Sequence, residues 1–376
     1  MSFLRHLSES LVERVDIMKV HVTAIAATLM ASTAMANESF QNPIEDYGYL
    51  WQFGLSEDHE LDSDSCIPTS WANALVYIQN TYEAELNGLQ IIPPGYEGWT
   101  QTALTLRSEE YMNTNNDLNS NNGTTGYYQA TGFEKYLSHV NAASPTTLLQ
   151  GLISTLGTQT EPPEGAQFPA WLLEGNPTFG QLQRWLESGA AVVININYLP
   201  DTHNGHAVVL TGLEWNDTNQ DGIIQLGEAT LSVVDPLDPS EEYGSDGTQA
   251  IGPTKKTFMN VFKQPETADD WAGLLVVRYD QYKGGFPFVD GVYETTFGVI
   301  TGSGALLVTN GPLGACCVST GCDNLIETQC DLIGGSWTLS GSCDDCAPPC
   351  PADNDNDGIV GIEDLLILID SWGFCP

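Results

Sequence analysis

The sequence predicts an α+β domain over residues 37–310, followed by a small cysteine-rich module over 311–350 and a short acidic tail over 351–376. Residues 37–310 mix helix-like and strand-like apolar periodicity and contain no internal repeat. The composition changes abruptly after Gly311-Pro312, and eight of the nine cysteines follow that point. The 41% apolar content supplies enough side chains for one sizeable core.

The net charge is strongly negative, with 49 acidic and 11 basic residues giving a formal charge of -38. Such a surface repels phosphates and anionic lipids, so we expect no nucleic-acid or membrane-surface partner. After the N-terminus no stretch reaches the roughly 18 apolar residues that a membrane span requires, and we expect none. General adaptation to a saline habitat explains most of these carboxylates as well as a dedicated function does.

The N-terminal segment has the pattern of an export signal that begins at Met18. Lys19 supplies the positive charge, residues 20–30 are apolar, and Ala34-Met35-Ala36 is a small-residue cleavage pattern. We therefore expect residues 1–36 to be a signal peptide and the protein to be secreted or held at the cell surface.

Cys66 stands about 250 residues upstream of the other cysteines. A lone cysteine in an exported chain is a buried structural residue, an intermolecular bridge or a nucleophile. Pro68 suits a first helical turn, so we expect an amphipathic helix to begin at Cys66. Its apolar face comprises Ile67, Trp71, Ala74, Leu75 and Ile78. The start of a helix favours negative charge, and hence the thiolate form of a cysteine.

Two downstream segments supply a base and an acid for this cysteine. His206 opens a predicted strand that continues to Gly212, and Asp235 ends a second predicted strand that starts at Leu231. If the two strands pair as a hairpin, His206 and Asp235 come to the same end of the sheet, where imidazole can take the thiol proton and Asp235 can orient the ring. His203 is an alternative base, although it precedes the strand.

Short motifs in a fixed order carry a resemblance to a known family. They are S-C-x-P-T-S-W-A-x-A-L around Cys66, a helix over 179–187 with a strand over 192–197, G-H-A-V-V-L-T-G around His206, and V-V-D-P around Asp235. Together they resemble the C39-like branch of papain-fold cysteine peptidases over about residues 47–240.

The resemblance implies a papain-like α+β fold and hydrolysis of peptide or protein substrates. It also implies that Cys66 is the nucleophile, His206 the general base and Asp235 its orienting group, with Gln52 helping to hold the oxyanion. Two features depart from the family pattern: Ile67 stands where Gly is usual, and acids at positions 60, 62 and 64 oppose a thiolate by like charge. The alternatives are a non-catalytic, calcium-dependent adhesion or assembly protein on the same scaffold, and a transferase or processing enzyme with the same triad.

A calcium-binding loop is predicted between the two strands. Residues 217–228 fill the twelve-position EF-hand pattern, with Gly222 at the sixth position for the turn. The expected ligands are Asp217, Asn219, Asp221, the Ile223 carbonyl and Glu228. Because this loop joins the strands of His206 and Asp235, we expect Ca²⁺ to have a structural role and to fix their register.

A second loop of this kind begins the tail at residue 353. Its expected ligands are Asp353, Asp355, Asp357, the Ile359 carbonyl and Asp364. With the apolar helix predicted after it, the loop resembles a single dockerin repeat, and the whole C-terminal region is similar to tails of exported planctomycete proteins. The resemblance implies a cohesin-like or cell-surface partner. The eight clustered cysteines predict up to four disulfides, although Cys343-x-x-Cys346 is also a zinc-binding pattern.

Overall fold

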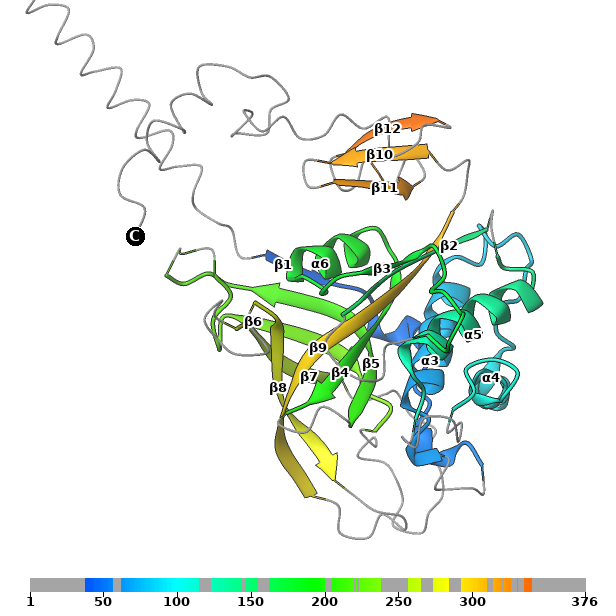
Figure 1. Ribbon diagram of the computed structural model, residues 1–376, viewed down its shortest axis with the longest axis horizontal. Helices are drawn as coiled ribbons and strands as arrows, with labels where there is room; N and C mark the ends of the chain where they lie inside the picture. Colours follow the sequence, from blue (N-terminus) through cyan, green and yellow to red (C-terminus); the bar gives the residue numbers. More distant parts are fainter. Residues whose placement is uncertain are drawn as a thin grey trace, which may run out of the picture.

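The computed structural model of the chain is mostly β, with helices packed along one side of a barrel (Figure 1). It describes residues 38–56, 62–114, 123–143, 146–154, 162–199, 204–219, 221, 223–237, 256–264, 273–283, 292–309, 314–318, 321–325, 330 and 335–339. The predicted signal peptide and the predicted dockerin-like tail lie outside these residues.

Six antiparallel strands close into a barrel, because β4 (Ala191–Tyr198) pairs with both β5 (Gly205–Trp215) and β9 (Val292–Val308). Three strands complete the circuit from β5 to β9 in chain order: β6 (Ala229–Val234), β7 (Lys256–Lys263) and β8 (Leu275–Lys283). A closed barrel of this kind is not the papain-like α+β fold that the resemblance implied for residues 37–310. That prediction is wrong.

The error arises in the last three strands of the barrel, which the sequence patterns did not predict. The strand β9 has 17 residues and pairs in turn with β8, β4 and β2. Glycines at 298, 302 and 304 weaken its strand signal, yet they permit close packing. A Cβ at Gly304 would lie 2.8 Å from Cζ2 of Trp71, so only glycine lets β9 pass this close to the indole ring.

Three shorter strands extend the sheet beyond the barrel. The strand β1 (Glu38–Gln41) pairs with β5, while β2 (Thr147–Ile153) pairs with the last part of β9. The strand β3 (Leu172–Glu174) runs parallel to β2. These additions place residues 151–153 and 302–304 side by side, next to the candidate site.

The barrel interior is filled by aliphatic side chains and is covered at one end by α6 (Phe179–Glu187). Both the helix and the following strand have the bounds expected from the sequence to within one residue. Thr178 caps α6 by accepting a hydrogen bond from the backbone N–H of Gln181 at 3.2 Å. Gly189, with φ of +78°, ends the helix turn and directs the chain into β4.

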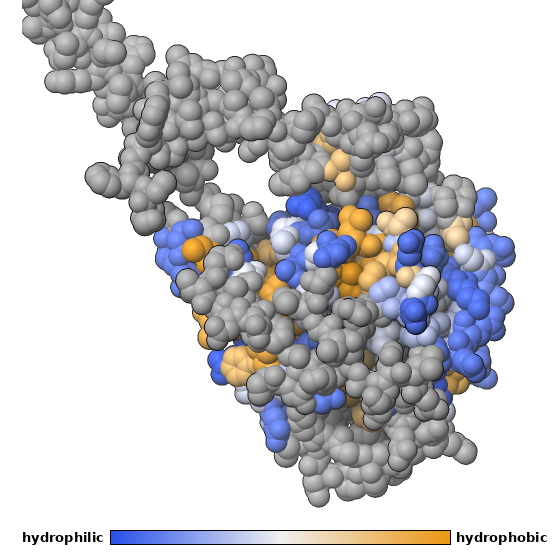
Figure 2. Space-filling model, in the orientation of Figure 1, coloured by the Kyte–Doolittle hydropathy of each residue, from blue (hydrophilic) through white to orange (hydrophobic). Residues whose placement is uncertain are grey.

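The other helices form a layer against the outer face of β4 and β5: α3 (Cys66–Thr81), α4 (Gly95–Arg107) and α5 (Gly126–His139). The helix α3 is buried on every side from Ile67 to Ile78, so it is a central helix rather than the amphipathic one expected. The ring of Trp71 stacks on Phe133 of α5 with centroids 3.9 Å apart. Hydrophilic residues predominate where α4 and α5 face outward (Figure 2). Two 3₁₀ turns, Ile44–Asp46 and Gln52–Gly54, precede this layer.

A separate three-stranded sheet follows the barrel, with β10 (Gly314–Val318) between β11 (Gly321–Leu325) and β12 (Ser336–Leu339). A disulfide joins Cys316 to Cys330, and Cys317 and Cys322 are also disulfide-bonded. The remaining cysteines of the predicted module, including Cys343 and Cys346, lie outside the described residues. No helix in the described part of the chain is both long and apolar enough to cross a bilayer.

Candidate active site

Cys66 is the first residue of α3, as the sequence predicted, and it carries a free, partly exposed thiol. The residues that follow it are buried, so the helix is anchored and the thiol has a fixed position. The N–H groups in the first turn of a helix lack intrahelical acceptors and present partial positive charge. The arrangement therefore places partial positive charge and a backbone donor beside the sulfur of Cys66.

A buried ion pair holds the turn that precedes Cys66. The carboxylate of Asp62, fully buried, pairs with the guanidinium of Arg107, the last residue of α4. Ser56 donates to the same carboxylate from its backbone N–H at 3.0 Å and from its hydroxyl at 2.9 Å. The sequence patterns suggested that Asp62 opposes a thiolate, but Arg107 neutralises its charge. Asp64 lies on the cleft wall, and Glu60 lies outside the described residues.

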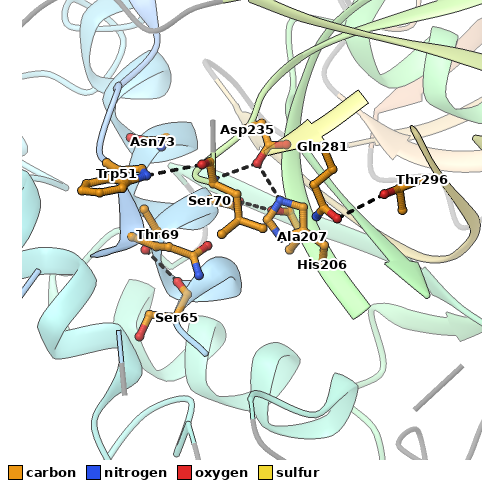
Figure 3. A network of polar contacts seen from close by, with 12 residues as sticks. Trp51, Ser65, Thr69, Ser70, Asn73, His206, Ala207, Asp235, Gln281 and Thr296 are labelled. Carbon is orange, nitrogen blue, oxygen red and sulfur yellow. Dashed lines mark hydrogen bonds and ion pairs between the residues drawn. The ribbon is translucent and has the colours of Figure 1, made fainter. Parts of the chain in front are cut away.

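His206 and Asp235 meet at one end of the β5–β6 hairpin, as predicted. Nε2 of His206 lies 2.6 Å from Oδ1 of Asp235, and the two side chains are only 1% and 2% exposed. Figure 3 shows the imidazole and the carboxylate pointing toward one another. The backbone N–H of Leu237 also donates to Oδ1 of Asp235 at 2.8 Å. The indole of Trp51 donates to the Leu237 carbonyl at 3.4 Å, so the N-terminal segment fixes the chain that carries Asp235.

The imidazole of His206 links this pair to the thiol. Because Nε2 faces Asp235, Nδ1 is the nitrogen left for Cys66, whose side chain is within hydrogen-bonding reach. Burial by itself lowers the pKa of His206, but Asp235, Tyr198 and hydrogen bonds to Asp235 and Cys66 together raise that pKa well above its usual 6.5. Asp235 therefore favours the protonated form of the imidazole that lies beside Cys66.

A polar cluster behind His206 was not predicted from the sequence. Gln281 of β8 donates through Nε2 to the hydroxyl of Tyr198, at the end of β4, and Thr296 of β9 donates to Oε1 of Gln281 at 3.5 Å. Burial raises the pKa of Tyr198 and raises that of Tyr279 further, so both phenols stay neutral. These residues come mainly from the strands that close the barrel, which explains why sequence patterns missed them.

Gln52 lies near the site but does not line the cleft. Its side chain is fully buried, and Nε2 donates to the backbone carbonyls of Asp62 at 3.3 Å and Ser63 at 2.7 Å. Both amide hydrogens are thereby directed at the turn before Cys66, and Oε1 has no hydrogen-bond partner among the described residues. The predicted oxyanion contact is not seen in this arrangement. Through these two hydrogen bonds Gln52 stabilises the turn that positions Cys66.

A cleft of about 200 Å³ opens over Cys66 and His206. Its walls come from the turn before α3, the start of α5, and strands β2, β4, β5 and β9. Most of its polar lining is uncharged: Thr124, Asn195, Asn197, Asn204 and Thr301. Neutral amides and hydroxyls of this kind can bind the main chain of a peptide, whose N–H and C=O groups are also neutral.

The predicted calcium loop connects β5 to β6, although Gln220 and Gly222 within it lie outside the described residues. Oδ1 of Asp217 and Oδ1 of Asn219 both accept from the Asp221 N–H, at 3.2 and 3.1 Å, so the two oxygens are close together. The carboxylate of Glu228 accepts from the hydroxyl of Thr218 at 2.8 Å, which brings the two ends of the loop together. These oxygens suit Ca²⁺ chemically. Across the described residues, however, no three His, Cys, Asp or Glu side chains converge as a metal-binding group. The second predicted loop, over 353–364, lies outside the described part of the chain.

Of the four residues predicted to be catalytic, the structure brings Cys66, His206 and Asp235 together at one site. The fourth, Gln52, contacts the turn before Cys66 instead. The alternative base His203 lies outside the described residues. No protein-family model, curated protein or solved structure matches the chain.

Proposed function

We propose that the protein is a cysteine-dependent hydrolase that cleaves peptide bonds through a thioester on Cys66. The observation that carries the proposal is the buried His206–Asp235 pair, 2.6 Å apart, against a free thiol at the start of a buried helix and at the floor of a cleft. A thiol, an imidazole and an orienting carboxylate in this order are the elements of nucleophilic acyl transfer.

The geometry assigns a role to each group. The sulfur of Cys66 attacks the substrate carbonyl carbon, and the negative charge that develops on the oxygen is stabilised by N–H groups in the first turn of α3. His206 gives its proton to the leaving amine as the C–N bond breaks, which leaves an acyl group on sulfur. His206 then takes a proton from water, whose oxygen attacks the thioester; the C–S bond breaks and releases the acid, leaving the Cys66 thiolate beside protonated His206. Asp235 holds the ring through Nε2 and stabilises its protonated form.

Alkylation of Cys66 by iodoacetamide tests this proposal without knowledge of the substrate. We expect the rate at about pH 6 to exceed that of an ordinary thiol, whose pKa is about 8.5, by tenfold or more. His206→Ala should reduce the rate to the ordinary value. His139→Ala is the matched control, because His139 is exposed at the end of α5 and contacts Tyr111 rather than the site. Equal rates in all three proteins would contradict the proposal and favour a non-catalytic binding role.

We further propose that the loop over 217–228 binds structural Ca²⁺. Asp217, Asn219, Asp221 and Glu228 would hold the ion, with the carbonyl of Ile223. The support is the convergence of Asp217 and Asn219 oxygens on one N–H, and the contact of Glu228 with Thr218 across the loop. A bound ion would neutralise these carboxylates and stabilise the hairpin that carries His206 and Asp235.

The predicted export signal places this activity outside the cytoplasm, and the tail would attach the protein to a cell-surface partner. Secretion of a chain that carries residues 1–36, and retention of one that lacks them, is the direct test.

A further inference from the structure

A hydrogen bond links the helix that carries Cys66 to the strand that carries His206. The hydroxyl of Ser70, in α3, donates to the backbone carbonyl of Ala207, in β5, at 2.8 Å. Both residues are fully buried, and Figure 3 shows Ser70 reaching across to Ala207. Ala207 directly follows His206 in the chain, so this contact lies one residue from the candidate base.

Ser70 lies on the same face of α3 as the thiol. It follows Cys66 by four residues, and residues four apart in a helix lie one above the other on one side. The helix is buried from Ile67 to Ile78 and packs against β5, so its packing keeps this face directed at the strand. The Ser70 hydroxyl therefore joins the thiol-bearing face of the helix to the histidine-bearing strand, one helical turn from the sulfur.

This part of β5 is held by a neighbouring strand on one edge only. The ladder between β5 and β6 starts at Val209, opposite Val234, and runs away from the site. On the other edge β5 pairs with β4, where Asn195 lies opposite Ala207. In the described ladders, residues 205–208 of β5 are therefore joined to β4 alone. A strand end with fewer backbone hydrogen bonds moves more easily, so a hydrogen bond from α3 contributes more to fixing its position.

We propose that Ser70 is a positioning residue, whose hydroxyl holds His206 at the separation from Cys66 that proton transfer requires. The inference rests on the proposed function of those two residues. Ser70 acts through the backbone of Ala207 and exchanges no proton with the substrate. Removal of its hydroxyl leaves a buried carbonyl without this donor, and the strand end then shifts toward another partner. A base works only within hydrogen-bonding reach of the proton it takes, so a small shift of this kind slows the reaction.

A double-mutant cycle on the full chain tests this role, with the rate of Cys66 alkylation by iodoacetamide as the readout. We expect Ser70→Ala to slow alkylation at about pH 6 by about three- to tenfold, because a displaced imidazole assists the thiol less. In the His206→Ala background, Ser70→Ala should cause no further slowing, because its effect passes through the imidazole. Thr69→Val is the matched control: Thr69 is equally buried, but its hydroxyl donates to the Ser65 carbonyl beside its own helix, at 2.7 Å.

The outcomes separate this inference from the proposed function. A loss in Ser70→Ala that persists without His206 overturns the positioning role, since it reflects a general disturbance of α3. An unchanged rate in Ser70→Ala, or an equal loss in Thr69→Val, also overturns it. If Ser70→Ala does not fold by circular dichroism, Ser70→Cys decides, because a thiol is only a weak donor. Tandem mass spectrometry then assigns the label to Cys66, and the smaller loss expected there must again vanish without His206.

The His206→Ala protein alone shows which of the two claims has failed. If it is alkylated as fast as the native chain, the proposed function is rejected and the positioning role with it. If it is slower while Ser70→Ala matches the native chain, the proposed function stands and the positioning role alone is rejected.

Discussion

The buried pair of Arg107 and Asp62 gives the most quantitative prediction. Asp62 is fully buried and depends on Arg107 for its countercharge. Arg107→Leu keeps the packing of the aliphatic stem but leaves the carboxylate unpaired. Removing one partner of a buried ion pair costs about 3–5 kcal/mol. Since Ser56 still donates two hydrogen bonds to Asp62, we expect the lower end, about 3 kcal/mol of unfolding free energy.

Urea unfolding at neutral pH and fixed calcium concentration measures this loss. Lys135→Leu is the matched control, because Lys135 and Glu110 form a pair at 3.5 Å whose side chains are 54% and 66% exposed. An exposed pair of this kind contributes about 0–1 kcal/mol. Asp62→Asn introduced with Arg107→Leu should recover part of the stability by removing the unpaired charge. A loss in Arg107→Leu no larger than in Lys135→Leu would refute the reasoning.

Three further predictions concern the site and its support. Because the folded-state pKa of His206 is raised, its proton stabilises the fold fully below about pH 6.5, and this contribution is lost as the pH rises through the raised value. The Tm difference between the native chain and His206→Gln should therefore shrink as the pH is raised above 6.5, and a constant difference would contradict it. If the 217–228 loop binds Ca²⁺, EGTA should lower the Tm of the native chain but change that of Glu228→Gln much less; equal shifts would exclude this loop as the site. Gly304→Ala places a Cβ 2.8 Å from the Trp71 ring, and should cost about 1–3 kcal/mol in urea unfolding; an unchanged midpoint would show that β9 can shift away.

The helix that begins at Cys66 and the strands near His206 and Asp235 were predictable, because residues close together in the sequence determine where a helix or strand begins and ends. Pro68 after Cys66 indicates a helix start, and the alternation around His206 and before Asp235 indicates strands. A hairpin then places the ends of those strands together, and the structure confirms that pairing. The end of α6 was predictable for the same reason, since Gly189 favours the left-handed conformation found there.

The barrel could not be predicted, because closure depends on long-range pairing. The strand β9 contacts β8 with its first half and β4 and β2 with its second, and no local pattern specifies three partners for one strand. The resemblance covered only residues to about 240, so it gave no information on β7, β8 or β9. The neutralisation of Asp62 was also hidden, since Arg107 is 45 residues away in the chain. Counting the acids that precede Cys66 in the sequence therefore overstated the negative charge beside the thiol, because Arg107 pairs with Asp62.

The central claim is that Cys66 forms a covalent acyl intermediate with the help of His206. Mixing the purified chain with p-nitrophenyl acetate, quenching in acid at successive times and sequencing the Cys66 peptide by mass spectrometry tests it directly. The account predicts an acetyl group on Cys66 that appears rapidly and then decays, is absent in Cys66→Ala, and forms far more slowly in His206→Ala than in His139→Ala. An acetylation rate that is the same with and without His206, or no acetyl group on Cys66 at any time, would contradict it.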